Sequence, residues 1–248
     1  MTKLSMLLAV VGIFLLSSCE TTREITLNEN GGGTFVTTTD MSGMIAIAKM
    51  NDKDNKMAEE KGLDTTVMLD KLVDSIPDLS AKDKDLLRTG KLDVQIDMAN
   101  DKFLTRLHFD FANSEQLTQL AKLSQKVTQE AMKKQMGDAN TSMPEEGMPE
   151  TDIEDYFTTT YSKGIIEKKL NAEKYAGVSN DQGMEALKQI AGQGMAMNTT
   201  YVFNLPRPAK KAEGKGVKLS EDKKKVTINT STEDFFDDPS KFEFRIEY

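Results

Sequence analysis

The side chains best suited to nucleophilic or metal chemistry are scarce in this chain. Its 248 residues include a single cysteine, Cys19, and a single histidine, His108. A catalytic triad needs a nucleophile beside its histidine, and no Gly-x-Ser-x-Gly elbow supplies one. Zinc needs several His or Cys ligands. We therefore predict neither a catalytic residue nor a metal site, and we place His108 on the polar face of a strand, beside Arg106 and Asp110.

Two glycine-rich stretches have the composition of a phosphate-binding loop but not its context. Gly31 to Gly33 follow an alternation of polar and apolar residues, which predicts a hairpin turn. Gly192 and Gly194 come at the end of a predicted helix, whereas a dinucleotide-binding fingerprint follows a strand. We therefore expect no cofactor.

Carboxylates are the one abundant class of functional group, with 40 Asp and Glu residues in the chain. Two of them suffice for glycoside hydrolysis, so a carboxylate-based envelope hydrolase is the alternative function. A loose divalent-cation site near 233–238 is a second hypothesis, and solvated loop charge is the simplest interpretation. The clustered acidic residues are Asp152, Glu154, Asp155, Glu233, Asp234, Asp237 and Asp238.

The setting of Cys19 points to export rather than to catalysis. Lys3 precedes an apolar run over 6–16, and Ser17 and Ser18 lead into the cysteine. A basic start, an apolar segment and small residues at a cleavage point are typical of a secretory signal peptide. The apolar run is about half of the roughly 20 residues that a transmembrane helix needs.

The sequence Leu16-Ser17-Ser18-Cys19 resembles the lipobox of bacterial lipoproteins. In that family the signal is cut before the cysteine, the thiol is diacylated and the new amino terminus is also acylated, with palmitate among the chains. The resemblance implies a signal peptide at 1–18, lipidation at Cys19 and a tether at 19–22. It also implies attachment to the cell membrane or outer membrane, facing the periplasm or the cell surface, because two or more acyl chains hold a protein stably.

The remainder of the chain resembles uncharacterised bacterial lipoprotein families more loosely. Its tail, Tyr201 to Tyr248, has a strand, Leu205-Pro206, a loop with Leu219-Ser220-Glu221-Asp222-Lys223 and a final strand. No activity is assigned to those families, so the resemblance implies no further site residue.

Net charge limits the partners of the protein. The chain carries a net charge of −8, whereas nucleic-acid binding needs a basic surface. We therefore exclude nucleic acid and expect membrane contact through lipid rather than through a basic face. The local basic group Arg207, Lys210, Lys211 and Lys215 is interpreted as part of a solvated loop.

Hydrophobic periodicity predicts the elements that frame these residues. Strict alternation indicates strands, and apolar residues at i, i+3, i+4 and i+7 indicate helices. In the first part of the chain, 23–136, this predicts strands at 23–29, 33–40, 92–98 and 103–111. It also predicts a helix capped by Asp64 that carries Leu69, Leu72, Val73 and Ile76, a short helix from Ser80, and a long helix from 114 to 136.

The second part, 152–248, follows a flexible loop or linker at 137–151. Alternation predicts strands at 155–161, 198–205, 225–230 and 242–248, with a helix capped by Asp181 and a loop at 207–223. The order of elements predicts an α+β fold, with a mostly antiparallel sheet built from hairpins and two or three packed helices. We expect the two parts to pack as one unit.

These features together predict a non-catalytic binding or assembly module rather than an enzyme. The apolar face of 92–111 and the helix 114–134 either form ordinary core or enclose a lipid-sized cavity. The expected partners are the membrane, through the acyl chains, and an envelope protein or an apolar ligand.

Overall fold

The computed structural model describes residues 19–43, 45, 49, 62–139, 152–192 and 197–248. The predicted signal peptide, most of 44–61 and the greater part of the predicted linker lie outside these described residues. All elements below therefore refer to the described part of the chain.

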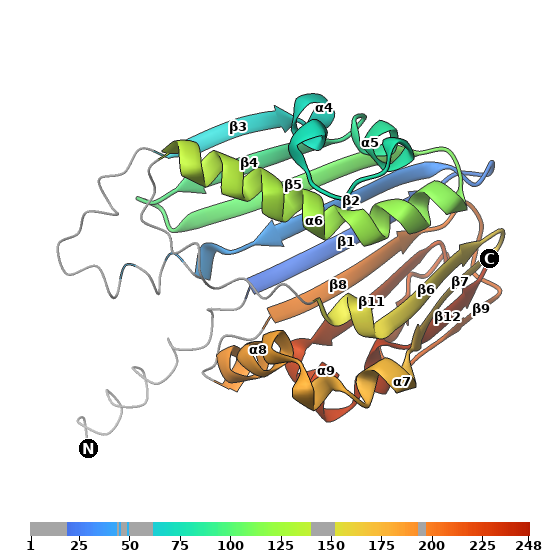
Figure 1. Ribbon diagram of the computed structural model, residues 1–248. Coiled ribbons are helices and arrows are strands. Elements are labelled where there is room, and N and C mark those ends of the chain that lie inside the picture. The colour runs from blue at the N-terminus through green and yellow to red at the C-terminus, as the bar shows by residue number, and fades with distance from the viewer. Residues whose placement is uncertain (1–18, 44, 46–48, 50–61, 140–151, 193–196) are drawn as a thin grey trace, which may run out of the picture.

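An eight-stranded sheet forms the main layer (Figure 1). Its order is β10-β11-β8-β1-β2-β5-β4-β3, and every pair is antiparallel except β1 with β8. The strands are β1 (Cys19–Leu27), β2 (Gly33–Asp40), β3 (Leu63–Met68), β4 (Lys91–Asp97), β5 (Lys102–Phe111), β8 (Met197–Asn204), β10 (Val217–Leu219) and β11 (Lys225–Ser231). The pairing of β1 with β8 brings the two parts of the chain into one sheet.

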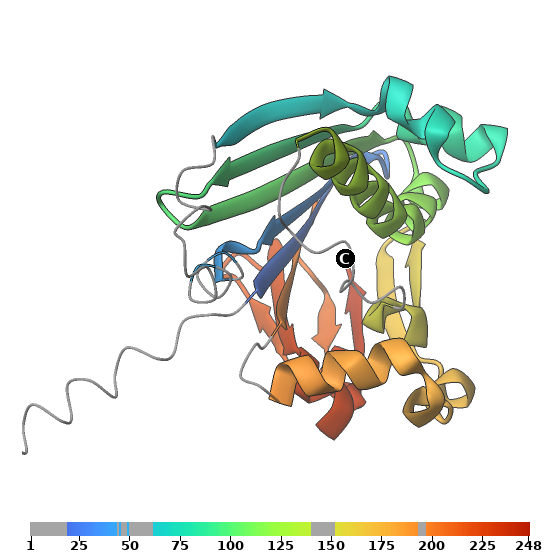
Figure 2. The same cartoon turned by 60° about the vertical axis from the view of Figure 1, so that its left-hand side comes forward.

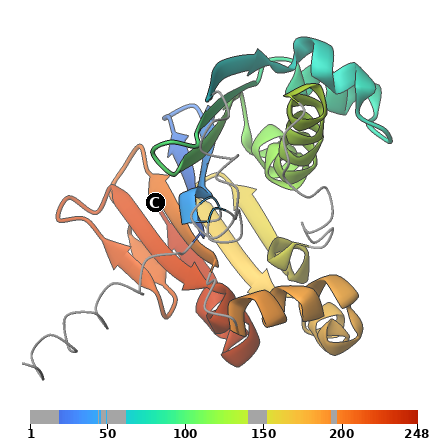
Figure 3. The ribbon, with the colours of Figure 1, turned by 90° about the vertical axis from the view of Figure 1, so that its left-hand side faces the viewer.

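A smaller antiparallel sheet lies beside the inner face of the first (Figure 3). Its order is β6-β7-β12-β9, with β6 (Phe157–Ser162), β7 (Ile165–Leu170), β12 (Phe244–Glu247) and β9 (Lys211–Glu213). Phe203 of the large sheet and Ile246 of the small sheet are both fully buried and belong to one hydrophobic cluster. The fold is therefore α+β and mostly antiparallel, as predicted.

The predicted hairpin 92–111 is confirmed, and it supplies the middle of the core. Leu92, Val94 and Ile96 of β4 alternate with more exposed polar residues, because successive side chains of a strand point to opposite faces. Leu107 and Phe109 of β5 are 2% and 0% exposed on the same face. His108 lies on the opposite, polar face, where its Nε2 is 3.6 Å from Asp110.

Helices cover the inner side of the large sheet. The described chain has α4 (Leu69–Leu72), α5 (Ala81–Leu87), α6 (Ser114–Ala139), α7 (Ala172–Tyr175), α8 (Gln182–Gly192) and α9 (Thr232–Asp237). The longest, α6, contacts β5 of the large sheet and β6 of the small one, while α8 and α9 close the lower end of the molecule in Figure 2. Two of these helices, α6 and α8, are longer than two turns, and the others are short connectors.

Local capping signals place several helix starts where they were predicted. Ser80 and Asp83 form a reciprocal capping box at the start of α5, with each side chain accepting from the other residue's backbone N–H. Asp181 Oδ1 accepts from the backbone N–H groups of Gly183 and Met184 at the start of α8. These side chains satisfy backbone donors that have no partner inside the helix.

Several regions differ from the prediction. Asp64 does not cap a helix: it lies in β3, whose β-branched Thr65, Thr66 and Val67 favour a strand, and the helix begins only at Leu69. The predicted loop 207–223 contains the short strands β9 and β10. Residues 137–139 continue α6, and the remainder of the predicted linker lies outside the described residues.

Candidate functional site

The most unusual chemical feature of the interior is a cluster of charged side chains between the two sheets, here called the ionic cluster. It consists of Arg23 on β1, Lys168 on β7, Tyr201 on β8, and Asp152 and Glu154 at the 3-10 turn Ile153–Tyr156. Four separate segments of the chain contribute to it, and it contains two cations and two carboxylates. Its formal charge is therefore balanced.

Glu154 is the centre of this cluster. Lys168 Nζ donates to both of its carboxylate oxygens, at 2.8 and 2.9 Å, and also to the hydroxyl of Tyr201 at 2.8 Å. The Tyr201 hydroxyl in turn donates to Glu154 Oε1. Both oxygens of Glu154 therefore have protein partners.

Arg23 extends the cluster toward the start of the 3-10 turn. Its two terminal nitrogens lie 3.3 Å from Asp152 Oδ2 and 3.3 Å from Glu154 Oε1. Asp152 also caps the turn, because its Oδ1 accepts from the backbone N–H of Glu154 at 3.1 Å. The arginine thus ties strand β1 to the turn that carries both carboxylates.

Three aromatic rings surround the ammonium group of Lys168. Its Nζ lies 4.4 Å from the ring centroid of Tyr201, 4.8 Å from that of Phe157 and 5.3 Å from that of Phe242. The lysine is 1% exposed. Ring faces attract a desolvated cation, so these contacts offset part of the cost of burying its charge.

Burial and the opposite charges nearby act in opposite directions on the pKa values of Glu154, Lys168 and Asp152. Burial alone raises the pKa of Glu154, but the charges of Lys168 and Arg23 outweigh it and bring that pKa to about 2. Burial lowers the pKa of Lys168 and raises that of Asp152, against the pull of their partners. Burial and the neighbouring Glu154 raise the pKa of the Tyr201 hydroxyl well above its ordinary value.

The cluster corrects the interpretation of Asp152 and Glu154 as solvated loop charge. Their side chains are 22% and 23% exposed and face buried cations. A sequence signal existed for the cation: Lys168 occupies the position between Ile166 and Leu170 on the apolar side of its strand. A lysine there needs a counterion, but the sequence does not reveal which of the 40 carboxylates supplies it.

We expect the low pKa of Glu154 to make stability depend on acid pH. The carboxylate stays ionised in the native state to a pKa of about 2, whereas its ordinary value is 4.5. Its contribution is therefore complete above about pH 4.5 and is lost as the pH falls toward about 2. The raised pKa of Asp152 acts in the opposite sense and offsets part of this loss.

Urea unfolding of the wild type and of Glu154→Gln, measured at several pH values, checks this prediction. The stability difference between them should be largest near neutral pH and should shrink as the pH falls below about 4.5, because the glutamine does not titrate. A difference that stays constant through that range would contradict the assignment.

Two buried polar atoms beside the cluster have no hydrogen-bond partner among the described residues. They are Arg23 Nε and Thr37 Oγ1, and the two residues are direct neighbours across β1 and β2. A buried hydroxyl without a partner costs about 1–3 kcal/mol. We therefore predict that Thr37→Val raises the free energy of unfolding by about 1 kcal/mol.

Thermal and urea unfolding of Thr37→Val measure this effect. Thr38→Val is the matched control, because Thr38 lies next along β2 and points to the opposite face of the sheet; its effect should stay within about 0.5 kcal/mol. Destabilisation by Thr37→Val would instead mean that its hydroxyl makes a bond to buried water.

Two of the acidic residues near 233–238, Asp234 and Asp238, bind other side chains of the protein. Asp234 completes a capping box with Ser231 and accepts from Lys241 Nζ at 2.5 Å. Asp238 accepts from Lys215 Nζ at 2.7 Å. Across the described residues no group of three or more His, Cys, Asp or Glu side chains is arranged to hold a metal ion. Lysine side chains of the same chain therefore bind Asp234 and Asp238, the two carboxylates named here from the predicted cation site.

The basic group in 207–223 is also paired with acidic side chains. Arg207 Nε lies 3.2 Å from Glu29, and Lys211 Nζ lies 2.8 Å from Glu213. Lys215 pairs with Asp238 as described above. The pairs are largely exposed, in agreement with a solvated surface.

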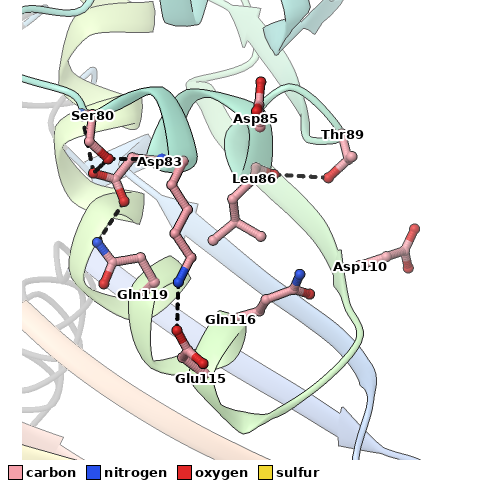
Figure 4. A pocket seen from close by; sticks show the side chains of 10 residues that line it. Ser80, Asp83, Asp85, Leu86, Thr89, Asp110, Glu115, Gln116 and Gln119 are labelled. Carbon is pink, nitrogen blue, oxygen red and sulfur yellow. Dashed lines mark hydrogen bonds and ion pairs between the residues drawn. The ribbon is translucent and has the colours of Figure 1, made fainter.

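A polar cavity of about 750 Å³ lies between α5 and the first turns of α6 (Figure 4). Lys82 bridges to Glu115 at 2.6 Å, and Gln119 donates to Asp83 at 2.7 Å. These two contacts occupy carboxylates that face the cavity. The cavity is partly open, and nine of its ten lining residues are polar or charged, so it does not match the apolar cavity considered from the sequence.

The apolar residues considered as walls of a ligand cavity pack together instead. Leu92 and Phe109 of the hairpin and Leu117 and Leu120 of α6 are each fully buried in one hydrophobic cluster. Side chains packed in this way fill the interior of a protein. The hairpin and α6 therefore contribute these residues to the hydrophobic core and not to the wall of a ligand cavity.

Cys19 is the first residue of β1. It pairs with Met197 of β8, and the next residue, Glu20, pairs with Asp40 of β2. Its side chain is half-buried against the main core, and burial together with the nearby Asp40 raises the pKa of its thiol. The residues expected as a tether, 19–22, thus belong to the central part of the sheet.

No helix among the described residues combines the length and the apolar character needed to cross a bilayer. Comparison with known proteins found no matching family model and no matching curated protein. Among solved structures, the chain is similar to the folded domain of the Mycobacterium tuberculosis protein LppM, determined by NMR. The two share 9% sequence identity with a TM-score of 0.39, and the similarity covers 93% of this chain and 90% of that domain.

Proposed function

We propose that the chain is a lipid-anchored protein of the bacterial cell envelope, with a binding or assembly role and no catalytic activity. One observation carries the proposal. The lipobox resemblance implies a mature amino terminus at Cys19, and that residue lies in β1, where it pairs with Met197 of β8. The residue that would carry the lipid is therefore itself part of the large sheet, so a lipid there would hold the folded unit at the membrane.

Side-chain chemistry supports a non-catalytic role. A general acid or base must be free to exchange a proton with a substrate. Glu154 instead has both oxygens bound by Lys168 and Tyr201, and Asp83 and Glu115 at the polar cavity are bound by Gln119 and Lys82. We accordingly rank the carboxylate-based hydrolase below a binding or assembly role with an envelope partner.

Radiolabelled palmitate and membrane fractionation test the anchor. The wild type should incorporate label, lose residues 1–18 and sediment with membranes. Cys19→Ala should incorporate no label, because it lacks the acceptor thiol. Ser5→Ala, a change inside the predicted signal, is the matched control and should behave as the wild type does. A wild-type protein without label, with an intact mass that shows no acyl chain, would refute the proposal.

Chemical cross-linking of the full-length protein in native membranes tests the partner. A binding or assembly role predicts a specific cross-linked species that mass spectrometry can identify. Hydrolysis of envelope glycans by the purified acylated protein would favour the alternative function, above all if Glu154→Gln abolished it while leaving the protein folded.

A further inference from the structure

We propose that the acylated protein stands end-on on the bilayer, with one defined rim of the large sheet against the lipid headgroups. This rim is the end of the sheet where β1 begins at Cys19, β8 begins at Met197 and β4 turns into β5 at 98–101. The inference rests on the proposed lipid anchor and adds to it a docking surface, a partner and an orientation.

No flexible segment separates the predicted anchor at Cys19 from the fold, because Cys19 is itself part of β1. Cys19 pairs with Met197 on one side, and Glu20 pairs with Asp40 on the other. A flexible tether of n residues would allow an end-to-end distance of about 5–6 Å × √n. Because β1 is paired from its first residues, the lipid is attached directly to a central strand of the rigid sheet.

Met41 and the β4–β5 turn lie at the same end of the large sheet as Cys19. Met41 follows Asp40 and lies beside Cys19, and its backbone N–H donates to Phe103 O at 2.8 Å. The β4–β5 turn is two residues beyond Phe103, which corresponds to about 7 Å past Cys19. In Figure 1 the starts of β1 and β8 and this turn all lie at the left-hand end of the sheet. A bilayer reached by the lipid on Cys19 is therefore also within reach of the turn.

Cys19 lies beside apolar residues. Its side chain packs against the main core, and Met41 is 6% exposed. Met197 packs against a second hydrophobic cluster, here called the second core, which consists of Tyr156, Phe157, Met184, Leu187, Phe235 and Phe242. The thioether and the first atoms of the lipid would thus leave the protein among apolar side chains. The same rim carries Glu20, Asp40 and an ion pair between Lys49 and Asp101. This mixed charge gives the rim no electrostatic attraction to lipid, so the covalent anchor sets the orientation.

The opposite end of the sheet, at the β1–β2 turn, lies far from Cys19 and serves as the reference position for the experiment below. The nine residues of β1 span about 26 Å from Cys19 to Leu27, at about 3.3 Å per residue. Beyond Leu27 lies the β1–β2 turn, where Asn30 is exposed. If the protein stands on its rim, the turn at Asn30 is held away from the membrane.

Fluorescence quenching on vesicles tests the orientation. The acylated full-length protein has no thiol other than the modified Cys19, so Ala99→Cys and Asn30→Cys each give a single site for an environment-sensitive fluorophore. Both are exposed turn positions. In phosphatidylcholine vesicles that contain lipids with a nitroxide headgroup, we expect at least twofold quenching at position 99 and none at position 30. The contrast should persist at high salt, since it does not depend on screened charge.

A spacer variant is the matched control. Insertion of ten Gly and Ser residues between Cys19 and Glu20 should keep the anchor and should reduce the contrast between the two positions. Equal quenching at both positions with the natural spacing, in protein that carries palmitate, would overturn the orientation alone. Protein from the same preparation that carries no palmitate would overturn the anchor and the orientation together.

Discussion

Replacing Glu154 by alanine should lower the free energy of unfolding by about 3–5 kcal/mol. Removal of one partner from a buried ion pair leaves the other charge without compensation, at a cost in this range. In this protein the remaining charges are Lys168, which is 1% exposed, and Arg23, which is 17% exposed. Tyr201 also loses the acceptor for its hydroxyl.

Urea denaturation measures this loss, provided that the m-value stays unchanged. Glu115→Ala is the matched control, because it removes a carboxylate from an equally short lysine pair whose side chains are 82% and 77% exposed. That surface pair should contribute far less to stability, because water screens its charges and holding the two side chains together costs conformational entropy. Equal losses in the two variants would show that the ionic cluster is no more important to stability than a surface ion pair.

The ionic cluster also links the predicted anchor to the rest of the molecule. Arg23 lies four residues after Cys19 on the same face of β1, because strand side chains alternate. Through Asp152 and Glu154 it joins β1 to the turn before β6, and through Glu154 to Lys168 on β7. A force applied at Cys19 is therefore shared between the two sheets rather than carried by the hydrogen bonds of one strand.

Local patterns in the sequence predicted the elements that depend on local causes. The hairpin at 92–111 was predicted from strict alternation, and the starts of α5 and α8 were predicted from the capping residues Ser80 and Asp181. Each of these signals lies within a few residues of the structure that it specifies. The α+β class followed from the order of such elements.

Contacts between distant residues could not be predicted in this way. The parallel pairing of β1 with β8 joins residues about 180 positions apart, and either strand alone has the same alternating pattern as an antiparallel neighbour. Arg23 is likewise remote in the sequence from its partner Asp152, which lies 129 positions further along the chain. The assignment of Asp64 to a helix failed because strand pairing with β4 outweighed a local capping signal.

Phe235→Ala should be as damaging as the loss of Glu154, at about 3–5 kcal/mol, although it removes no charge. Phe235 is fully buried, and its ring centroid lies 5.4 Å from that of Tyr156 and 5.3 Å from that of Tyr175. Its ring also contacts Phe157 and Phe242, the two phenylalanines beside Lys168. A cavity at this position would loosen the aromatic wall of the ionic cluster as well as the second core.

The neighbouring Phe236→Ala is the control, because that ring is only partly buried and its loss should cost about 1–2 kcal/mol. Urea unfolding of Phe235→Ala, Glu154→Ala and the double variant then measures the coupling between the second core and the ionic cluster. Residues that share neighbours are expected to depart from additivity by about 0.5–3 kcal/mol. Additive losses would mean that the aromatic wall and the ionic cluster stabilise the protein independently, and that the rings beside Lys168 do not depend on Phe235 for their position.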